Sequence, residues 1–275
     1  MRIDAHCHLG SRQFDADREE VVNRMLEEQV EGAILICCNP EDHRKALELK
    51  RKHPYFKIAV GIHPQDLERD AGEERLRRFR ESVLRERPDM IGEIGLDYYS
   101  HPHTKESQLR FFHAQLALAQ ELGLPVDIHS RKAVKDTQDI LKQYHVKTIL
   151  HSFSGSLETA REYLKAGCFL SFGASVLFPN ARRPEEVIRN VPAEKMLLET
   201  DAPYQSPVRD HRHEPSDVVN IYRKVSEIKG IPLPQLEAIL EKNYKDIFGE
   251  ERNVLSAIPE ERTDHRDLCP FSRHR

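Results

Sequence analysis

The sequence predicts a closed (β/α)8 barrel, or TIM barrel, formed by a single domain. About eight apolar segments alternate with charged amphipathic segments along the 275 residues, which is the pattern of a barrel of parallel strands. Most of the apolar segments are continuous, as expected for strands buried on both faces. No hairpin signal or long polar linker interrupts the pattern, so we expect one domain over residues 1–250. An open doubly wound sheet is the alternative, although no G-x-G-x-x-G or Walker run follows any strand.

The strands are predicted from short apolar runs that end at a Gly, a Pro or a polar residue. The first run opens at Ile3 and closes at Gly10, and the second extends from Gly32 to Cys38, before Asn39-Pro40. The remaining predicted strands cover residues 57–62, 90–96, 126–128, 147–150, 168–172 and 196–199.

The helices are predicted from apolar residues that recur at a spacing of three or four among charged ones. The segment 106–122 is the clearest example, because Gly123 and Pro125 follow it and stop a helix. The other predicted helices cover residues 15–29, 41–51, 73–86, 133–143, 157–165, 184–189, 215–229 and 234–248.

Composition limits the class of protein. The formal charge is −4 and the pI about 6.4, so no global basic field indicates nucleic acid, although a local positive site stays compatible with both values. Aromatic residues make up 7% and Trp is absent, which argues against a stacking platform for single strands. Five scattered cysteines without a C-x-x-C pair indicate a reduced chain. We expect no signal peptide, no membrane span, a cytoplasmic location and a monomer.

Residues 251–275 differ from the rest in composition and form a charged tail. His265, Cys269 and His274 can be drawn as a metal cluster there, but their spacing fits no established pattern. A solvated or surface-packed extension is the interpretation that we prefer.

Histidines and carboxylates stand where the predicted strands end. In a parallel barrel these ends converge on one mouth. Four imidazoles with two carboxylates suffice for two divalent ions that share a carboxylate. The predicted metal ligands are His6, His8, Glu93, His129, His151 and Asp201.

Two further residues are candidates for substrate binding. His63, in Gly61-Ile62-His63-Pro64, is predicted to contact a phosphate; a seventh ligand or a structural His before Pro64 are the alternatives. Arg131 lies two residues after His129, and its guanidinium is suited to binding a phosphate oxyanion. The alternative role for Arg131 is a salt bridge with Asp97. A basic rim is expected from Arg182, Arg183, Arg209 and Arg212.

The first strand makes more detailed predictions. Side chains alternate along a strand, so Asp4, His6 and His8 are expected on one face and Cys7 on the other. We expect Asp4 to orient the two imidazoles and Cys7 to be a buried packing residue.

The motifs at these positions resemble those of the TatD family of metal-dependent deoxyribonucleases, in the amidohydrolase superfamily. D-x-H-C-H-L lies at residues 4–9, G-x-H-P at 61–64 and G-E-x-G-L-D-Y at 92–98. I-H-x-R at 128–131, H-x-F-S-G at 151–155 and L-E-T-D-x-P-Y at 198–204 follow in the family's order. Two positions depart from the family: Lys132 replaces an acid, and His213 replaces the Asn of R-x-N-E-P.

The resemblance implies a TIM barrel that holds one or two divalent ions, with Zn, Mg and Mn all compatible. It implies one ion on His6, His8, Glu93 and Asp201 and another on Glu93, His129 and His151, with Glu93 as the bridge. It also implies a deoxyribonuclease with 3′–5′ exonuclease-like hydrolysis of nucleic acid, DNA being the expected substrate. In that reaction a metal-activated water loses a proton to the catalytic Asp201, which also orients it, and the resulting hydroxide attacks phosphorus.

Two other functions are compatible with the same residues. The hydroxide could attack carbon instead, as in an ester or amide hydrolase such as a D-aminoacyl-tRNA deacylase. A metal-free binding scaffold on the same barrel is the non-enzymatic alternative, and it predicts gaps in the ligand set that we do not find in the sequence.

Overall fold

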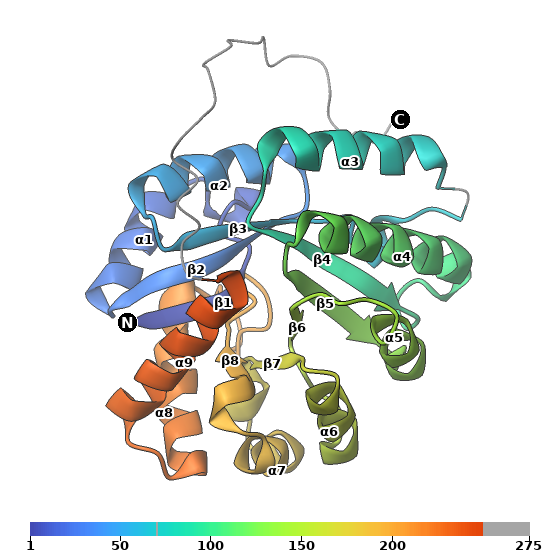
Figure 1. Ribbon diagram of the computed structural model, residues 1–275. Coiled ribbons are helices and arrows are strands. Elements are labelled where there is room, and N and C mark those ends of the chain that lie inside the picture. Colours follow the sequence, from blue (N-terminus) through green and yellow to red (C-terminus); the bar gives the residue numbers. More distant parts are fainter. Residues whose placement is uncertain (70, 250–275) are drawn as a thin grey trace.

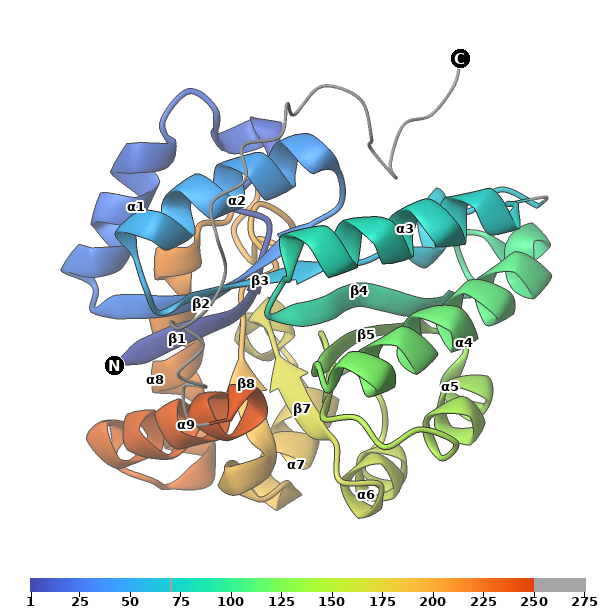
Figure 2. The ribbon, with the colours of Figure 1, turned by 45° about the horizontal axis from the view of Figure 1, so that its top comes forward.

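Eight parallel strands form a barrel in the order β1 to β8, with helices between them, in this computed structural model (Figures 1 and 2). The structure describes residues 1–69 and 71–249; the predicted tail and its candidate cluster lie outside the described residues. The strands are β1 (Arg2–Cys7), β2 (Val30–Cys37), β3 (Phe56–Val60), β4 (Met90–Asp97), β5 (Val126–Arg131), β6 (Thr148–Leu150), β7 (Phe169–Phe172) and β8 (Met196–Leu198). The predicted TIM-barrel fold is thereby confirmed.

The helices lie outside the strands, close to the predicted ranges. They are α1 (Arg18–Glu27), α2 (Pro40–Lys52), α3 (Glu73–Glu86), α4 (Lys105–Leu122), α5 (Val134–Leu141), α6 (Leu157–Lys165), α7 (Arg182–Asn190), α8 (Val218–Lys229) and α9 (Leu233–Phe248). Short 3-10 turns are η1 (Arg12–Phe14), η2 (Pro64–Asp66), η3 (Pro102–Thr104), η4 (Ala174–Leu177), η5 (Ala193–Lys195) and η6 (Pro215–Asp217). Side-chain caps fix where several of these helices begin. Before α2, for example, the Asn39 side chain accepts the Asp42 N–H at 3.0 Å.

The seam between the last and first strands closes the barrel through residues of the loop after β8. His8 donates its backbone N–H to Ala202 O at 2.7 Å, and Asp201 donates its own to His6 O at 3.0 Å. A bridge between Cys7 and Ala202 lies at the same seam. The seam therefore also sets the distance between two histidines and an aspartate that were predicted as ligands.

The barrel interior is apolar at one end and polar at the other. Its amino-terminal half is filled by side chains such as Ile3, Ile34 and Phe169, and α9 adds Tyr244 and Ile247 to the same cluster. Burying each large side chain of this kind contributes about 1.5–3 kcal/mol. α9 lies across this end in Figure 1. The carboxyl ends of the strands are thus the end at which polar side chains gather.

The expected alternation along β1 fails at one point. Asp4 pairs with Ala33 and Cys7 pairs with Leu35, so β1 inserts one extra residue between these pairs, as a β-bulge does. Asp4 consequently shares a face with Cys7, and its carboxylate accepts hydrogen bonds from Thr200 Oγ1 (2.5 Å) and Thr200 N (2.9 Å). Cys7 is buried in the layer between strands and helices, as predicted.

Candidate metal centre at the mouth of the barrel

The six residues predicted as metal ligands lie together at the carboxyl ends of the strands. His6 and Glu93 belong to β1 and β4, and His129 belongs to β5; His8 and His151 directly follow β1 and β6, and Asp201 lies three residues after the end of β8. All but His129 and His151 are buried, and those two are nearly so. The site is therefore a polar cluster largely shielded from water.

Glu93 stands at the centre of this cluster. Its Oε2 lies 3.6 Å from His6 Nε2. Its Oε1 lies 2.7 Å from His129 Nδ1 and 3.7 Å from His151 Nε2. The two oxygens of one buried carboxylate thus face different sets of imidazoles.

Asp201 faces the two histidines of the first strand. Its Oδ1 lies 3.5 Å from His6 Nε2 and 3.3 Å from His8 Nε2, while Oδ2 accepts the Gln205 amide at 2.6 Å. The backbone of Asp201 has φ 62, in the left-handed region that Asp tolerates better than most residues. This turn directs the carboxylate back into the mouth immediately after β8.

Three overlapping groups of side chains have ligand atoms within 4.8 Å of one another and could hold a metal ion. They are His6, His8 and Asp201; His6, Glu93 and His151; and His63, Glu93 and His129. His6 joins the first two groups and Glu93 joins the last two. Mixed nitrogen and oxygen donors of this kind suit Zn²⁺ and other divalent cations.

The charges at the mouth also fit a cation. Burial alone would raise the pKa of Glu93, but His63, His151 and His129 hold it well below its usual range. Burial likewise lowers the pKa of His129, yet Asp97 and Glu93 raise it to about 9. The buried His6 Nε2 has no hydrogen-bond partner although it points at two carboxylates. A divalent ion would both satisfy this atom and offset the buried negative charge.

A second layer of acids behind the imidazoles was not predicted. Asp127 Oδ2 lies 2.9 Å from His6 Nδ1, Glu199 Oε1 lies 2.8 Å from His151 Nδ1, and Asp97 Oδ2 lies 3.4 Å from His129 Nε2. Carboxylates in this position fix the tautomer and orientation of metal-binding imidazoles. Asp127 and Glu199 are acids within otherwise apolar strand segments, and this placement is the sequence signal that could have identified them.

Two unpredicted contacts come from outside these strands. Cys38, next to the end of β2, places Sγ 3.6 Å from His8 Nδ1, and Gln205 holds Asp201 as described above. No local sequence pattern predicts either contact. The contact of Cys38 joins two segments that are distant in the chain, and the contact of Gln205 depends on how the loop after β8 turns.

The two predicted substrate-binding residues lie on either side of Glu93 and His129. His63 Nε2 is 3.3 Å from Glu93 Oε1, so His63 belongs to the cluster itself. Arg131 is exposed, and its guanidinium lies 4.3 Å from the centre of the Tyr99 ring. Asp97, the alternative partner of Arg131, instead contacts His129 and accepts the Gln65 amide at 2.6 Å.

Comparison with known proteins assigns this arrangement to a family. The family described as TatD related DNase matches residues 3–249, almost the whole described chain. The chain belongs to this family. It is 37% identical over 253 residues to a Bacillus subtilis protein named metal-dependent hydrolase YabD, covering 90% of this chain and 99% of that one. It is 35% identical to the 3′-5′ ssDNA/RNA exonuclease TatD of Erwinia tasmaniensis, covering 90% and 99%.

A solved structure agrees with the TatD assignment. The TatD homologue YJJV of Escherichia coli superposes with a TM-score of 0.82 at 27% identity, covering 90% of this chain and 97% of that one. An amidohydrolase from Saccharomyces cerevisiae shares the fold, with a TM-score of 0.75 at 20% identity. Like its TatD relatives, the chain is a metal-dependent hydrolase.

One part of the expected basic rim of this TatD chain is wrong. Arg212 is held by Asp17 at 2.5 Å and Glu214 at 2.9 Å, so its charge is already neutralised. Arg182, Arg183 and Arg209 are exposed. His213, which replaces the family's Asn, is buried with Nδ1 3.0 Å from Tyr204 O, next to the metal cluster but outside it.

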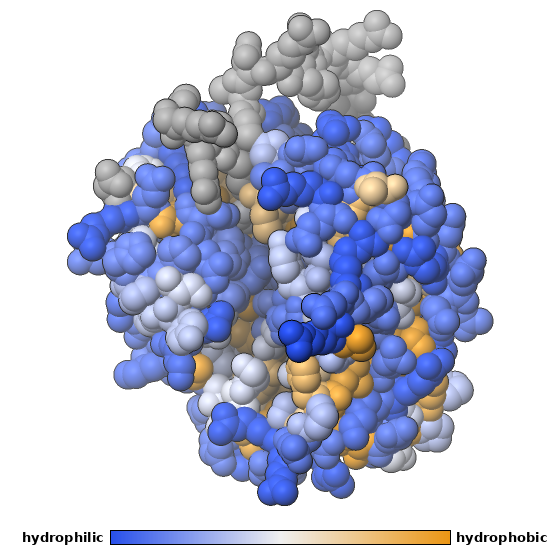
Figure 3. Space-filling view, turned by 180° about the vertical axis from the view of Figure 1, so that it is seen from behind, coloured by the Kyte–Doolittle hydropathy of each residue, from blue (hydrophilic) through white to orange (hydrophobic). Residues whose placement is uncertain are grey.

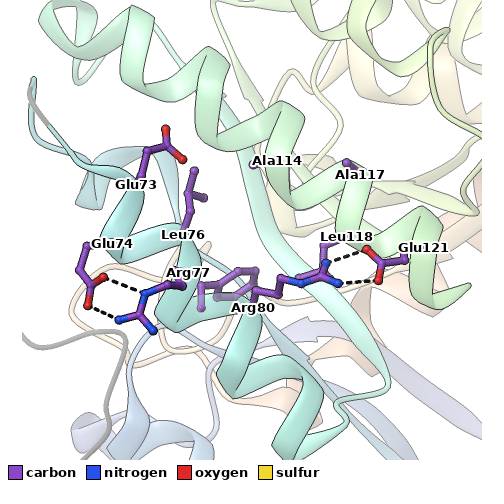
Figure 4. A pocket seen from close by; sticks show the side chains of 10 residues that line it. Glu73, Glu74, Leu76, Arg77, Arg80, Ala114, Ala117, Leu118 and Glu121 are labelled. Carbon is purple, nitrogen blue, oxygen red and sulfur yellow. Dashed lines mark hydrogen bonds and ion pairs between the residues drawn. The ribbon is translucent and has the colours of Figure 1, made fainter.

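A groove on the outer surface lies away from this centre. It runs between α3 and α4 (Figure 4), and its apolar lining includes Leu76, Phe79 and Leu118. Ion pairs from Arg77 to Glu74 and from Arg80 to Glu121 border it. Because these charged side chains are paired with one another, the groove lacks polar groups that point together at a ligand. Catalysis needs such groups, and the mouth of the barrel has them. No helix in the described part of the chain is long and apolar enough to cross a membrane.

Proposed function

We propose that this chain is a nuclease that hydrolyses phosphodiester bonds in DNA, in the 3′–5′ exonuclease manner, with two divalent ions at the mouth. The names of the TatD exonuclease of Erwinia tasmaniensis and of the human deoxyribonuclease TATDN3, 27% identical over 273 residues, support this substrate. Glu93 carries the proposal. A buried carboxylate that offers one oxygen to His6 and the other to His129 and His151 is suited to bridging two ions.

The ions, when bound, supply Lewis-acid activation of water and of the scissile phosphoryl group. The catalytic Asp201 accepts the proton that the attacking water loses. Without an ion, His8, His151 and His6 outweigh the effect of burial and hold the pKa of Asp201 below its usual range, so the carboxylate is ionised and able to accept a proton. Glu93 provides the shared negative charge between the two halves of the site.

His63 and Arg131 act on the substrate phosphates. The Nδ1 of His63 accepts the Gln65 N–H at 3.2 Å, so the proton of the neutral ring is on Nε2. Nε2 faces the cluster and can donate to a phosphate oxygen, which favours substrate binding over a role as seventh ligand. The Arg131 guanidinium offers a paired set of donors to a neighbouring phosphate.

A substrate panel on metal-stripped protein tests the reaction class. Zn²⁺, Mg²⁺ or Mn²⁺ is added back, and single-stranded DNA, duplex DNA, RNA, a simple phosphodiester and a charged tRNA are compared. We expect metal-dependent release of nucleotides from DNA 3′ ends. Faster deacylation of the charged tRNA than cleavage of any phosphodiester would overturn the proposal in favour of an acyl-ester hydrolase.

Replacing Asp201 tests the mechanism. Asp201→Asn is expected to lower kcat by at least about a hundredfold, since the proton acceptor is lost, while circular dichroism and Tm show an intact fold. Asp210→Asn in the same loop is the matched control, because Asp210 is exposed and contacts only Arg209 at the surface. Phosphodiesterase activity near that of the wild type in Asp201→Asn would contradict the assignment.

A further inference from the structure

Exposed aromatic side chains gather around the mouth of the barrel. Within residues 1–69 and 71–249, four Tyr or Phe residues have exposed side chains, and three of them lie in loops that follow strands: Tyr99 after β4, Phe178 after β7 and Tyr204 after β8. Tyr55, just before β3, is the fourth. Val208, also exposed, lies in the loop after β8, and the exposed Val134 is the first residue of α5, which follows β5. The chain therefore has few aromatic residues overall, but most of the exposed ones lie in the loops at the mouth.

The ring of Tyr204 and the backbone of Tyr99 contact residues of the candidate metal centre or the acids behind it. The Tyr204 ring lies 5.3 Å from the His8 ring in an edge-on arrangement. Asp97, which contacts His129, also accepts the backbone N–H of Tyr99 at 3.0 Å. The Tyr204 ring is therefore placed beside a candidate ligand, and the backbone of Tyr99 is held by an acid that contacts another.

Unpaired positive charge accompanies the rings. Arg131 lies over Tyr99, and Tyr99 still has 62% of its surface exposed, so the ring is open to a further stacking partner. Arg182 and Arg183 follow Phe178 at the start of α7, and both are exposed. Aromatic rings interleaved with cations are the usual means of binding a single strand, whose bases stack while its phosphates pair.

The strand order places the loops after β4 and β7 well apart around the mouth. β4 and β7 are separated by β5 and β6 on one side and by β8, β1, β2 and β3 on the other. Tyr99 and Phe178 therefore stand on different sides of a mouth whose centre is Glu93. Seen from the side opposite to Figure 1, the surface is hollowed near its middle, with hydrophobic residues in and beside the hollow (Figure 3).

We propose that Tyr99, with Arg131, and Phe178 are two base-stacking subsites that hold a single-stranded oligonucleotide across the metal centre. Tyr204, beside His8, contacts the nucleoside next to the scissile phosphate. The inference rests on the proposed nuclease function and adds how the strand is held. It requires unpaired bases, because a base stacked within a duplex cannot lie on Tyr99 or Phe178.

Binding without turnover provides the first test. Fluorescence anisotropy of a labelled deoxyoligonucleotide of ten residues is measured in chelator, for the wild type and for Tyr99→Ala, Phe178→Ala and Tyr55→Ala. Each of the first two variants is expected to bind about tenfold to a hundredfold more weakly, as for the loss of one base stack. Tyr55→Ala, an equally exposed ring at the other end of the barrel, is expected to bind as the wild type does.

Further variants separate stacking from mere apolar contact. Tyr99→Trp is expected to retain binding and Tyr99→Leu to lose it, since Leu has no π face. Equal binding of Tyr99→Leu and wild type, or equal binding of single-stranded and duplex DNA by the wild type, would overturn the inference. Absence of oligonucleotide binding by the wild type would overturn it as well.

Kinetics distinguish this inference from the proposed function. The ratio of kcat/KM on the oligonucleotide to kcat/KM on methyl p-nitrophenyl phosphate is expected to fall about tenfold in Tyr99→Ala and Phe178→Ala. A wild type that cleaves neither substrate contradicts the proposed function. A wild type that cleaves both, with an unchanged ratio in the two variants, contradicts the stacking subsites alone.

Discussion

The imidazoles at the mouth owe their orientation to acids that lie one layer behind them. His6 is held through Nδ1 by Asp127, and His151 through Nδ1 by Glu199, so each Nε2 is directed toward Glu93. An imidazole that donates from Nδ1 keeps the lone pair on Nε2, which is the state that a metal ligand needs. The acids therefore decide which nitrogen of each ring faces the centre.

Asp127 offers a direct test of this role. Burial raises the pKa of Asp127, and its Oδ1 has no hydrogen-bond partner, so the carboxylate is costly to the fold. Asp127→Asn is expected to weaken metal binding about tenfold to a hundredfold, measured by isothermal titration of the metal-stripped protein. The Tm of the metal-free variant is expected to be unchanged or higher.

Asp139→Asn is a matched control, because Asp139 is exposed on α5 and pairs only with Lys135 and Lys142. Wild-type metal affinity in Asp127→Asn would show that Asp127 does not orient His6. A lower Tm of the metal-free variant would instead assign Asp127 a mainly structural role.

Single residues differ in how far the sequence predicts them. The convergence of the six candidate ligands could be predicted because a polar residue at the end of an apolar run is a local signal, and the six lie together in the structure. Cys38 and Gln205 could not, because their contacts with His8 and Asp201 depend on how loops meet at the mouth. Arg212 was misassigned because Asp17, its partner, lies 195 residues away in the chain.

At the scale of the elements, close approach of neighbouring strands shapes the site. Gly95 lies in β4 beside His129 of β5, and a Cβ on Gly95 would come within 2.0 Å of His129 O. Its φ of 140 also lies in the region that side chains rarely adopt. The strand pair that carries Glu93 and His129 can thus form without strain only with glycine at this position.

Replacing Gly95 should therefore damage stability and site together. Gly95→Ala is expected to lower the free energy of unfolding by about 2–4 kcal/mol, through backbone strain and the displaced carbonyl, as measured by urea denaturation. Metal affinity is expected to fall as well, because His129 moves with its carbonyl.

Gly167→Ala is the control for the effect of backbone conformation alone. Gly167 has φ 83, but a Cβ there would meet nothing within 4 Å. We expect a loss of roughly 1 kcal/mol without a change in metal affinity. Equal effects of the two substitutions would mean that the contact with His129 O is unimportant.

The elements themselves were largely predictable because periodicity and breakers are local properties. The bulge in β1 was not, because the extra residue is defined only by pairing with Ala33 and Leu35 of β2. It turns Asp4 toward Thr200 and so ties β1 to the residue before Asp201. Asp4 thus holds the seam, and because its Oδ1 also accepts the His6 backbone N–H at 3.3 Å, its predicted role in orienting the histidines stays a prediction.

For the molecule as a whole, apolar and polar residues are separated along the barrel axis. The amino-terminal half contains Ile3, Ile34 and Phe169 under α9, whereas the mouth holds buried acids around the imidazoles. Those acids are Glu93, Asp97, Asp127, Glu199 and Asp201. The core stabilises the barrel, and this charge must be balanced by imidazolium or by a bound cation.

Metal removal should therefore lower the stability of the entire barrel. An ion present at a hundred times its Kd adds about 2.7 kcal/mol, which for a chain of this size corresponds to a rise in Tm of roughly 5–10 °C. Differential scanning calorimetry of stripped and reloaded protein measures this shift.

In Glu93→Gln, which keeps the shape but removes the central charge, most of the shift should disappear, while the stripped variant melts no lower than stripped wild type. A full shift in Glu93→Gln would place the stabilising ion away from Glu93. A wild type without any shift at metal concentrations that support hydrolysis would contradict the prediction itself, since the folded barrel would then bind the ion no better than the unfolded chain.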